Sequence, residues 1–455
     1  MLGLLPVILT FAGAYMLAKL RFFFILHPIA MLRKTARSVK DLDTAKSLAL
    51  ALAGTLGVGN IFGVCLGIII GGAGSVFWLI ISSIFSSVLK YCEVTLSSDR
   101  SLSAVDKKYG MISTLASLKG RGGRGLSYIY AVACLSLSLV MGSALQCGTV
   151  SETVSEIFDT PPVIVGIIFA FLVLLSIMRG VKIIEKITLI AMPLSTIVYI
   201  IITLSIVVIR IERLPDVISL IFTSAFSRRS GVGAFLGLIF SPAVCEGYSR
   251  GILSNEAGCG TSSFAHMRGG ILNPASAGLM GIIEVVFDTV ILCSLTALAV
   301  LTAVPNYASY NEGMSLIVEA VGSTLGDGYL FVLFILVFLF AYSTVVCWYY
   351  YGSVSFSYLM RGRFGILFLP FYLIAVFLGS VIDNRLLVAL TDASLLVLSA
   401  CTVYAIIKKS DRVVTLSELG GTLAPRKFIR SVSLRGREKR ASRASLTAHR
   451  QKQPR

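Results

Sequence analysis

Long apolar runs dominate the chain and alternate with short polar segments. Eleven of these runs approach or exceed the roughly 20 residues that a helix needs to cross about 30 Å of hydrocarbon. They lie at residues 3–26, 46–70, 74–97, 125–156, 160–178, 187–209, 231–266, 270–304, 328–359, 364–381 and 386–407. The pattern predicts an all-α polytopic membrane protein with about 11 transmembrane helices.

Two of the apolar runs are interrupted in the middle. The run 46–70 contains GTLGVGN at 54–60, and the run 231–266 contains SNEAGCG at 254–260. Each glycine costs about 1 kcal/mol relative to alanine inside a helix, and a carboxylate such as Glu256 costs about 2.5–3.5 kcal/mol at the bilayer centre. Irregular backbone survives at that depth only where protein encloses it, so both breaks are candidate sites. The alternative for the first break is a helix-packing seam, because Gly59, Gly63 and Gly67 are spaced four residues apart.

The breaks divide the spans into two groups of five, each beginning with a broken helix and running in opposite directions across the membrane. Secondary transporters with inverted repeats share this plan, and their sites lie where the broken helices meet. We therefore expect five segments. They are an extra amino-terminal span (1–26), a basic cytoplasmic linker (27–45), a first repeat (46–210), a second, inverted repeat (229–408) and a basic tail (409–455).

Basic residues in the loops predict the orientation, since Lys and Arg accumulate on the cytoplasmic side. They follow the first span, from Arg33 to Lys46, and the third, from Arg100 to Arg124. The amino terminus is then outside and the carboxy terminus inside a plasma (inner) membrane. One loop disagrees, because Arg210, Arg213, Arg228 and Arg229 fall in a segment placed outside.

Composition agrees with a membrane protein, because 56% of the residues are hydrophobic and only 14% are charged. The formal net charge of +17 is concentrated in the tail, where residues 409–455 hold thirteen Lys or Arg against three acidic residues. This tail lacks apolar periodicity and is expected to be disordered and held near anionic lipid. Nucleic-acid binding is the alternative, but no folded module accompanies the charge, so no nucleic-acid partner is expected.

Enzyme chemistry finds little support in the sequence. The nine cysteines include no CxxC pair, and the three histidines form no HExxH motif. No GxSxG elbow is present either. The sequence therefore indicates a protein without covalent chemistry.

Several segments together resemble a known family. They are GTLGVGNIFGV (54–64), GAGSVFWLIISSIFSSVLKYCEV (72–94), RGILSNEAGCG (250–260), FDTVILCSLTAL (287–298) and FAYSTVVCWYYYG (340–352). In this order they resemble the alanine or glycine:cation symporter family, from about residue 46 to 407. The resemblance implies a fold similar to the leucine transporter with one extra span. It also implies sodium-coupled uptake of small neutral amino acids.

The resemblance also implies the positions of a substrate site. The substrate carboxylate would meet backbone amides of the first break, and the ammonium would face carbonyls of the second. Gln146 matches a glutamine that faces substrate, and Trp348 matches a tryptophan that closes the pocket, although an interfacial anchor is the alternative for Trp348. The implied substrate residues are Val58, Gly59, Asn60, Gln146, Leu253, Ser254, Asn255, Glu256 and Trp348.

A sodium site is implied by the same resemblance. Sodium prefers carbonyl and hydroxyl oxygens, which Ala53 and Leu56 on one helix and Ser343 and Thr344 on another would supply. The alternative is that the two hydroxyls bond the carbonyls of their own helix. Asp288 matches a family aspartate and is interpreted as structural or gating.

Some positions depart from the family pattern. Val58 stands where the family usually has threonine, and Leu253 where it usually has phenylalanine. Thr261-Ser262-Ser263 replaces a Ser-Ala-Pro segment, and a His-Pro and Arg-Gln pattern is absent around 273–278. Two alternatives therefore remain. One is a transporter of the same fold with another substrate, or with proton coupling through Glu256. The other is a membrane sensor or scaffold that recruits partners through its tail.

Overall fold

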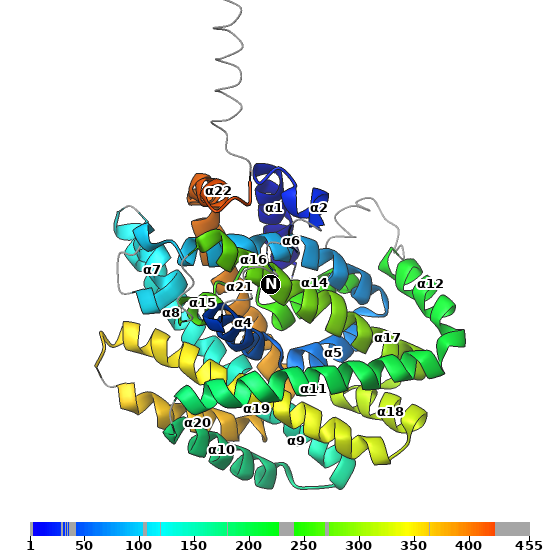
Figure 1. Ribbon diagram of the computed structural model, residues 1–455. Coiled ribbons are helices and arrows are strands. Elements are labelled where there is room, and N and C mark those ends of the chain that lie inside the picture. The colour runs from blue at the N-terminus through cyan, green and yellow to red at the C-terminus, as the bar shows by residue number, and fades with distance from the viewer. Residues whose placement is uncertain are drawn as a thin grey trace, which may run out of the picture.

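The computed structural model describes residues 3–28, 31, 33, 35, 42–102, 107–118, 120–179, 181–226, 241–268, 273–363 and 365–423. Every regular element in this part of the chain is a helix, which confirms the all-α class (Figure 1). Six helices are long and apolar enough to cross a membrane. They are Gly74–Ser97, Gly122–Phe158, Met192–Ile209, Pro274–Ala303, Gly328–Leu359 and Asn384–Lys408. The total of eleven crossings stays a prediction.

Most of the predicted runs coincide with helices. The first run forms α1 (Leu4–Lys19) and the short α2 (Phe23–Leu26). The unbroken runs correspond to α6 (Gly74–Ser97), α10 (Pro162–Met178), α11 (Val181–Ile209), α19 (Gly328–Leu359), α20 (Phe368–Gly379) and α21 (Asn384–Lys408).

Both predicted breaks are present as interruptions of helices. The first lies between α4 (Leu42–Thr55) and α5 (Phe62–Gly71), with the 3₁₀ turn η1 (Val58–Asn60) in it. The second lies between α14 (Pro242–Asn255) and α15 (Ser263–Arg268). Helix α14 packs against α5 and α6, so the two breaks come together in the middle of the bundle (Figure 1).

Two further spans contain π-helical turns, which the sequence pattern did not reveal. The turn η4 (Val140–Ala144) joins α8 (Arg121–Leu139) to α9 (Leu145–Phe158). The turn η6 (Val286–Cys293) joins α16 (Pro274–Val285) to α17 (Ser294–Ala303). Such turns rotate the following side chains relative to a regular helix and are frequent at functional sites.

Several helices lie in segments predicted as connections. They are α7 (Gly110–Ala116), α12 (Leu214–Ala225) and α18 (Gly313–Leu325). Short 3₁₀ turns lie at η2 (Arg100–Leu102), η3 (Lys107–Tyr109), η5 (Ile211–Arg213), η7 (Tyr307–Ser309) and η8 (Gly365–Leu367). Helix α18 falls in the expected outer loop and packs against α5.

The prediction of a disordered tail from residue 409 is wrong for its first part. Ser410–Leu419 form the helix α22, in which Val413 and Val414 are buried. The Ser417 hydroxyl is 2.6 Å from the Tyr91 hydroxyl of α6, and Arg412 donates to Asp99. The apolar positions of this short helix are outnumbered by polar ones, which hides its buried face in the sequence. Residues 424–455 lie outside the described residues.

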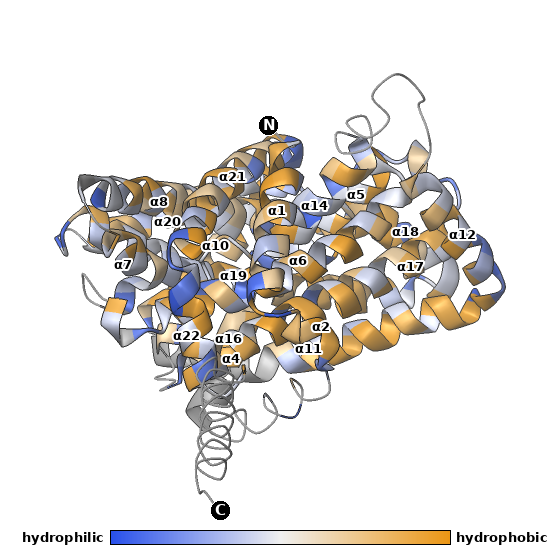
Figure 2. Ribbon diagram, turned by 90° about the horizontal axis from the view of Figure 1, so that it is seen from above, coloured by the Kyte–Doolittle hydropathy of each residue, from blue (hydrophilic) through white to orange (hydrophobic). Residues whose placement is uncertain are grey.

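The outer surface of the bundle is apolar. Figure 2 shows mainly hydrophobic residues along α11 and other outer helices. Large exposed side chains on α10 and α11 include Ile164, Ile167, Ile168, Phe171, Ile197, Ile201, Leu204 and Val208. An apolar surface of this extent suits contact with lipid rather than water.

Candidate functional site

The glycines of the first break let three other segments approach the backbone. A Cβ atom on Gly57 would stand 2.8 Å from the Thr344 hydroxyl and 3.1 Å from the Gln146 carbonyl oxygen. A Cβ atom on Gly59 would stand 3.2 Å from the backbone oxygen of Leu253. A side chain at Gly57 would therefore displace Thr344 and Gln146, and one at Gly59 would press on the second break.

The packing-seam alternative describes the next turns of the same span. A Cβ atom on Gly63 would stand 3.1 Å from the side chain of Leu253, and one on Gly67 would stand 2.8 Å from that of Arg250. These two glycines allow α5 to lie close to α14. Gly59 faces the second break and belongs to the site, whereas Gly63 and Gly67 form the seam.

The second break turns sharply through left-handed backbone. Glu256 has φ of 53°, Gly258 of 81° and Gly260 of 79°. Glycine adopts this conformation freely, but a glutamate there stores strain of about 1–3 kcal/mol, which is typical of functional sites. This conformation ends α14 at Glu256 and turns the chain into the second break.

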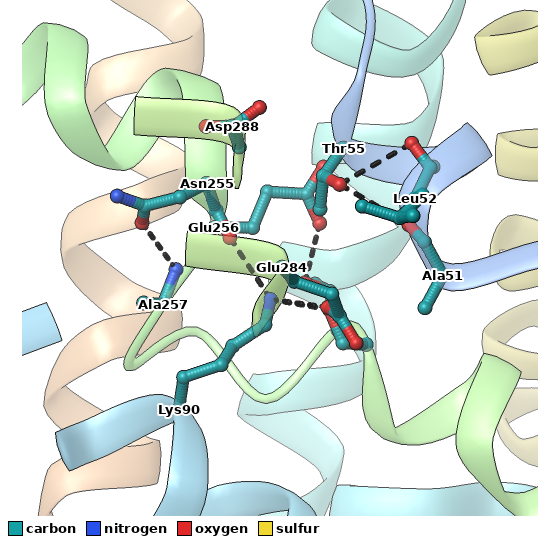
Figure 3. A network of polar contacts seen from close by, with 12 residues as sticks. Ala51, Leu52, Thr55, Lys90, Asn255, Glu256, Ala257, Glu284 and Asp288 are labelled. Carbon is teal, nitrogen blue, oxygen red and sulfur yellow. Dashed lines mark hydrogen bonds and ion pairs between the residues drawn. The ribbon is translucent and has the colours of Figure 1, made fainter. Parts of the chain in front are cut away.

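A small cavity separates the two breaks. Its volume is about 10 Å³, room for about one water molecule, and it lies between α4, η1, η4, α9, α14 and α19. Its walls are Gly54, Thr55, Gly57, Gly59, Met141, Leu145, Gln146, Leu253, Glu256 and Thr344. Figure 3 shows the Glu256 side chain reaching from the second break toward Thr55 across this space.

Of the residues expected at the substrate, Gly59, Gln146, Leu253 and Glu256 line this cavity. The Gln146 carbonyl oxygen accepts from the Val58 N–H at 3.3 Å, and its amide donates to the Met141 oxygen at 3.0 Å. Met141 and Leu145 were missed, because η4 rotates them toward the cavity and no sequence signal marks a π-helical turn.

Glu256 offers an unused acceptor to this region. One carboxylate oxygen accepts from the Thr261 hydroxyl at 2.5 Å. The other, Oε1, is buried without a hydrogen-bond partner among the described residues. A buried unpaired carboxylate oxygen is costly, so a cationic or hydrogen-bonding ligand is expected to meet it.

Asn60, Ser254 and Asn255 point away from the cavity, into a cluster around Asp288. The Asp288 carboxylate accepts from Asn60 Nδ2 at 2.6 Å and from the Ser254 hydroxyl at 2.5 Å. Asn255 donates to the Thr289 hydroxyl at 2.9 Å, and that hydroxyl donates to Asp288 at 2.9 Å. This cluster joins both breaks to η6.

Trp348 does not line the cavity. Its side chain is fully buried, and its indole N–H donates to the backbone oxygen of Gly54 at 3.2 Å. A Cβ atom on Gly142 would stand 2.4 Å from the indole ring, so η4 packs directly on it. Full burial rules out the interfacial-anchor alternative for this conformation. Trp348 instead fixes the end of α4 through its hydrogen bond to Gly54.

Three of the four residues expected to bind sodium come together. The Thr344 hydroxyl lies 3.2 Å from the Ala53 oxygen and 3.4 Å from the Leu56 oxygen. Ser343 does not join them, because its hydroxyl donates to the Leu339 oxygen at 2.8 Å, within its own helix. The neutral oxygens on α4 and α19 have the character that a sodium ion prefers.

A wider cavity of about 370 Å³ lies among α5, α9, α10, the segment before α18 and the turn before α21. Phe62 and Leu66 form part of its wall, together with Glu152. The Glu152 carboxylate accepts from the Met314 N–H at 2.9 Å and from Asn384 Nδ2 at 2.7 Å. Glu152 thereby ties the start of α18 to α9 and α21.

Comparisons with known proteins agree on one family. The model of the sodium:alanine symporter family matches residues 1–418. The chain is 32% identical to the sodium/alanine symporter AgcS of Methanococcus maripaludis, over 70% of this chain and 71% of that protein. It is 30% identical to the sodium/proton-dependent alanine carrier protein of Bacillus sp. (strain PS3), over 72% of this chain and 75% of that protein.

A solved structure shows a similar fold. The crystal structure of MhsT in complex with L-phenylalanine matches with a TM-score of 0.53 and 15% identity, and covers 74% of this chain and 78% of that chain. This likeness confirms the expected fold of the leucine-transporter type. The match to the family model confirms a membrane transporter rather than an enzyme. Since that model covers nearly the whole chain, the protein belongs to the sodium:alanine symporter family.

Proposed function

We propose that this secondary transporter couples the uptake of small neutral amino acids, of the alanine and glycine type, to the entry of sodium. The observation that carries the proposal is the convergence of the Ala53 and Leu56 oxygens on the Thr344 hydroxyl beside the cavity. These neutral oxygens suit a small alkali cation. The cavity next to them supplies groups of the kind that an amino acid needs.

The substrate would lie across both breaks. Its carboxylate would meet the backbone amides of Gly59 and Asn60, and that of Val58 in place of the Gln146 oxygen, where the 3₁₀ turn favours negative charge. Its ammonium would meet the backbone oxygen of Leu253 and the unpaired oxygen of Glu256. In this conformation the cavity is too small for an amino acid, so the breaks would have to move apart to admit one, and Met141, Leu145 and Leu253 would then form the apolar wall around its side chain.

Sodium would couple to the substrate by fixing the first break. An ion held by α4 and α19 would draw the end of α4 against α19 and stabilise the arrangement of Gly57 and Gly59 that the substrate needs. A ligand shifts a conformational equilibrium only by its difference in affinity for the two states. Each ligand would then increase the affinity for the other.

The arrangement in the membrane is part of the same proposal. The amino terminus would be outside and the carboxy terminus cytoplasmic. The extra span (1–26) and the basic linker (27–45) would precede two inverted repeats (46–210 and 229–408). The basic tail would lie near anionic lipid. Membership in a transporter family favours this function over the sensor or scaffold alternative.

Uptake of labelled alanine and glycine into proteoliposomes tests the proposal. We expect accumulation under an inward sodium gradient, and none when choline replaces sodium. Failure of both amino acids to accumulate under either a sodium or a proton gradient would overturn it.

Proton coupling through Glu256 is the second candidate, and the unpaired oxygen of that buried carboxylate favours it. Accumulation driven by a proton gradient without sodium, and lost in Glu256→Gln, would support this candidate. Sodium-driven uptake that is indifferent to the proton gradient would exclude it.

A further inference from the structure

Two charged residues of α6 lie buried against the second break. Lys90 is fully buried, and so is Glu93 one turn further along the helix. A charge inside a membrane span is costly and persists only where specific contacts compensate it. Gly281 of α16 makes room for the lysine stem, since a Cβ atom there would stand 3.0 Å from Lys90 Cγ.

The two charges contact opposite ends of the break. The Lys90 ammonium donates to the backbone oxygen of Asn255, the last residue of α14, at 2.9 Å, and also to the Ser262 hydroxyl. The Glu93 carboxylate accepts from the N–H of Gly260 at 2.8 Å. Figure 3 shows the Lys90 side chain pointing to Asn255 and Glu284.

Acidic residues complete the surroundings of the ammonium. Lys90 Nζ lies 3.5 Å from Glu284 Oε2 and 3.8 Å from Glu93 Oε1. The other oxygen of Glu284 lies 2.5 Å from His266 Nε2. A carbonyl at the end of a helix, a hydroxyl and two carboxylates are oxygen groups that would otherwise attract a free cation.

The two breaks differ in the charge of the group that contacts their carbonyl oxygens. At the first, the carbonyls of Ala53 and Leu56 accept only weak hydrogen bonds from the neutral hydroxyl of Thr344. At the second, the carbonyl of Asn255 is bound by a full positive charge that is covalently part of the protein. The expectation that Asn255 offers its carbonyl to the substrate ammonium is therefore not met, and Leu253 and Glu256 remain.

We propose that Lys90 is a tethered cation that takes the place of a bound ion at the second break, so that a transported cation is needed only at the first. Lys90 acts as a positioning residue, because it fixes the end of α14 from which Leu253 and Glu256 face the cavity. The effect of Lys90 on substrate binding rests on the proposed function, but its replacement of a bound cation does not.

Thermal unfolding of the purified full chain in detergent tests the inference with Lys90→Ala, Lys90→Arg and the wild type. Sodium is held constant, and methylammonium chloride is compared with an equal concentration of choline chloride. Methylammonium fits the space of the removed ammonium, whereas choline is too large and controls for ionic strength. We expect methylammonium to raise the melting temperature of Lys90→Ala by at least about 3 °C over choline. The wild type and Lys90→Arg should show no difference between the salts.

Alanine-induced stabilisation provides a second readout. In choline, Lys90→Ala should lose the upward shift that alanine causes in the wild type, and methylammonium should restore it. A wild type without any alanine shift would contradict the proposed function and leave the salt comparison as the test of Lys90. Equal stability of Lys90→Ala in both salts, with a normal alanine shift, would overturn the inference.

The double variant Lys90→Met with Glu93→Gln covers the case in which Lys90→Ala does not fold in either salt. It removes both charges of α6, while Glu284 keeps its contact with His266. We expect it to fold and to lose the alanine shift, because the end of α14 is no longer held. A normal alanine shift in this variant would overturn the inference.

Discussion

At the scale of single residues, the glycines of the first break have two different tasks. Gly57 and Gly59 let Thr344, Gln146 and the Leu253 carbonyl approach the backbone. Gly63 and Gly67 instead allow close packing of α5 on α14. The sequence presented Gly59, Gly63 and Gly67 as one repeating pattern, and only their neighbours in space separate the two tasks.

Substitution of Gly57 is predicted to abolish the site without unfolding the bundle. In Gly57→Ala the new methyl group displaces the Thr344 hydroxyl and Gln146, so sodium-driven alanine uptake should fall at least about tenfold. Gly122→Ala is the matched control, since a Cβ atom there meets no atom within 4 Å. Equal uptake by the two variants would contradict the assignment of Gly57.

The neighbouring residues Ser343 and Thr344 allow a more specific test of the sodium site. Thr344→Ala removes an oxygen that faces the Ala53 and Leu56 carbonyls, so the sodium concentration for half-maximal uptake should rise at least about tenfold. Ser343→Ala removes a hydroxyl that bonds its own helix, and the same concentration should change less than about threefold. The sodium dependence of initial uptake rates distinguishes them. A larger effect of Ser343→Ala would show that the sodium site lies elsewhere.

Residue types alone located only part of the site. Asn60, Ser254 and Asn255 were expected at the substrate, but their side chains form the cluster around Asp288. Their direction depends on the exact rotation at each break and on η6, which no periodicity encodes. Glu256 lies in a predicted break, whereas Gln146 and Thr344 were expected only from the family resemblance, and all three line the cavity.

At the scale of elements, both breaks could be predicted because glycine and charge interrupt otherwise continuous apolar runs. Helices α18 and α22 could not, since α18 is apolar but only 13 residues long, and α22 carries more polar than apolar residues. Packing stabilises them instead: Gly313 of α18 lies against Phe62, and Ser417 of α22 pairs with Tyr91. Short surface helices owe their stability mainly to such tertiary contacts.

The docking of α22 is predicted to depend on pH through Asp99. Burial by itself would raise the pKa of Asp99, but hydrogen bonds from Arg412 and Ser101 outweigh it and hold the pKa below its ordinary value. The pair therefore stabilises the fold above the ordinary pKa of aspartate, and this contribution is lost as the pH falls through the lowered value. Asp99→Asn should lower the free energy of unfolding at neutral pH by about 1 kcal/mol.

Thermal unfolding at neutral and acidic pH measures this effect. Asp411→Asn is the control, because Asp411 pairs with Lys19 at 3.0 Å but its side chain is 89% exposed. We expect no change in that variant. A wild type and an Asp99→Asn variant of equal stability at neutral pH would contradict a role of Asp99 in docking α22.

Glu152 is predicted to control the movement of α18 over the wider cavity. Glu152→Ala removes the acceptor for Met314 and Asn384, so the maximal uptake rate should fall about tenfold. Glu152→Gln keeps one acceptor oxygen and should lose less. Initial uptake rates give the measurement, with the exposed Glu156 changed to alanine as the control. A similar loss in Glu156→Ala would assign the effect to charge rather than to α18.

At the scale of the whole molecule, two interrupted helices meet inside a bundle whose outer face is apolar. This arrangement exposes backbone groups at membrane depth where protein surrounds them, which is the condition under which such groups are stable in lipid. The sequence predicted the plan through its two breaks. The number of crossings and the orientation of the termini remain predictions, because the loops give conflicting charge signals around residues 210–229.

The influx of radioactive sodium into proteoliposomes tests most directly whether sodium and the amino acid cross together. Proteoliposomes are loaded without sodium, and alanine is added outside with labelled sodium present. We predict that alanine increases the initial sodium influx and that Thr344→Ala removes most of this increase at a sodium concentration near the half-maximal value of the wild type. Alanine entry at the normal rate without any increase in sodium influx would contradict sodium-coupled transport by this protein.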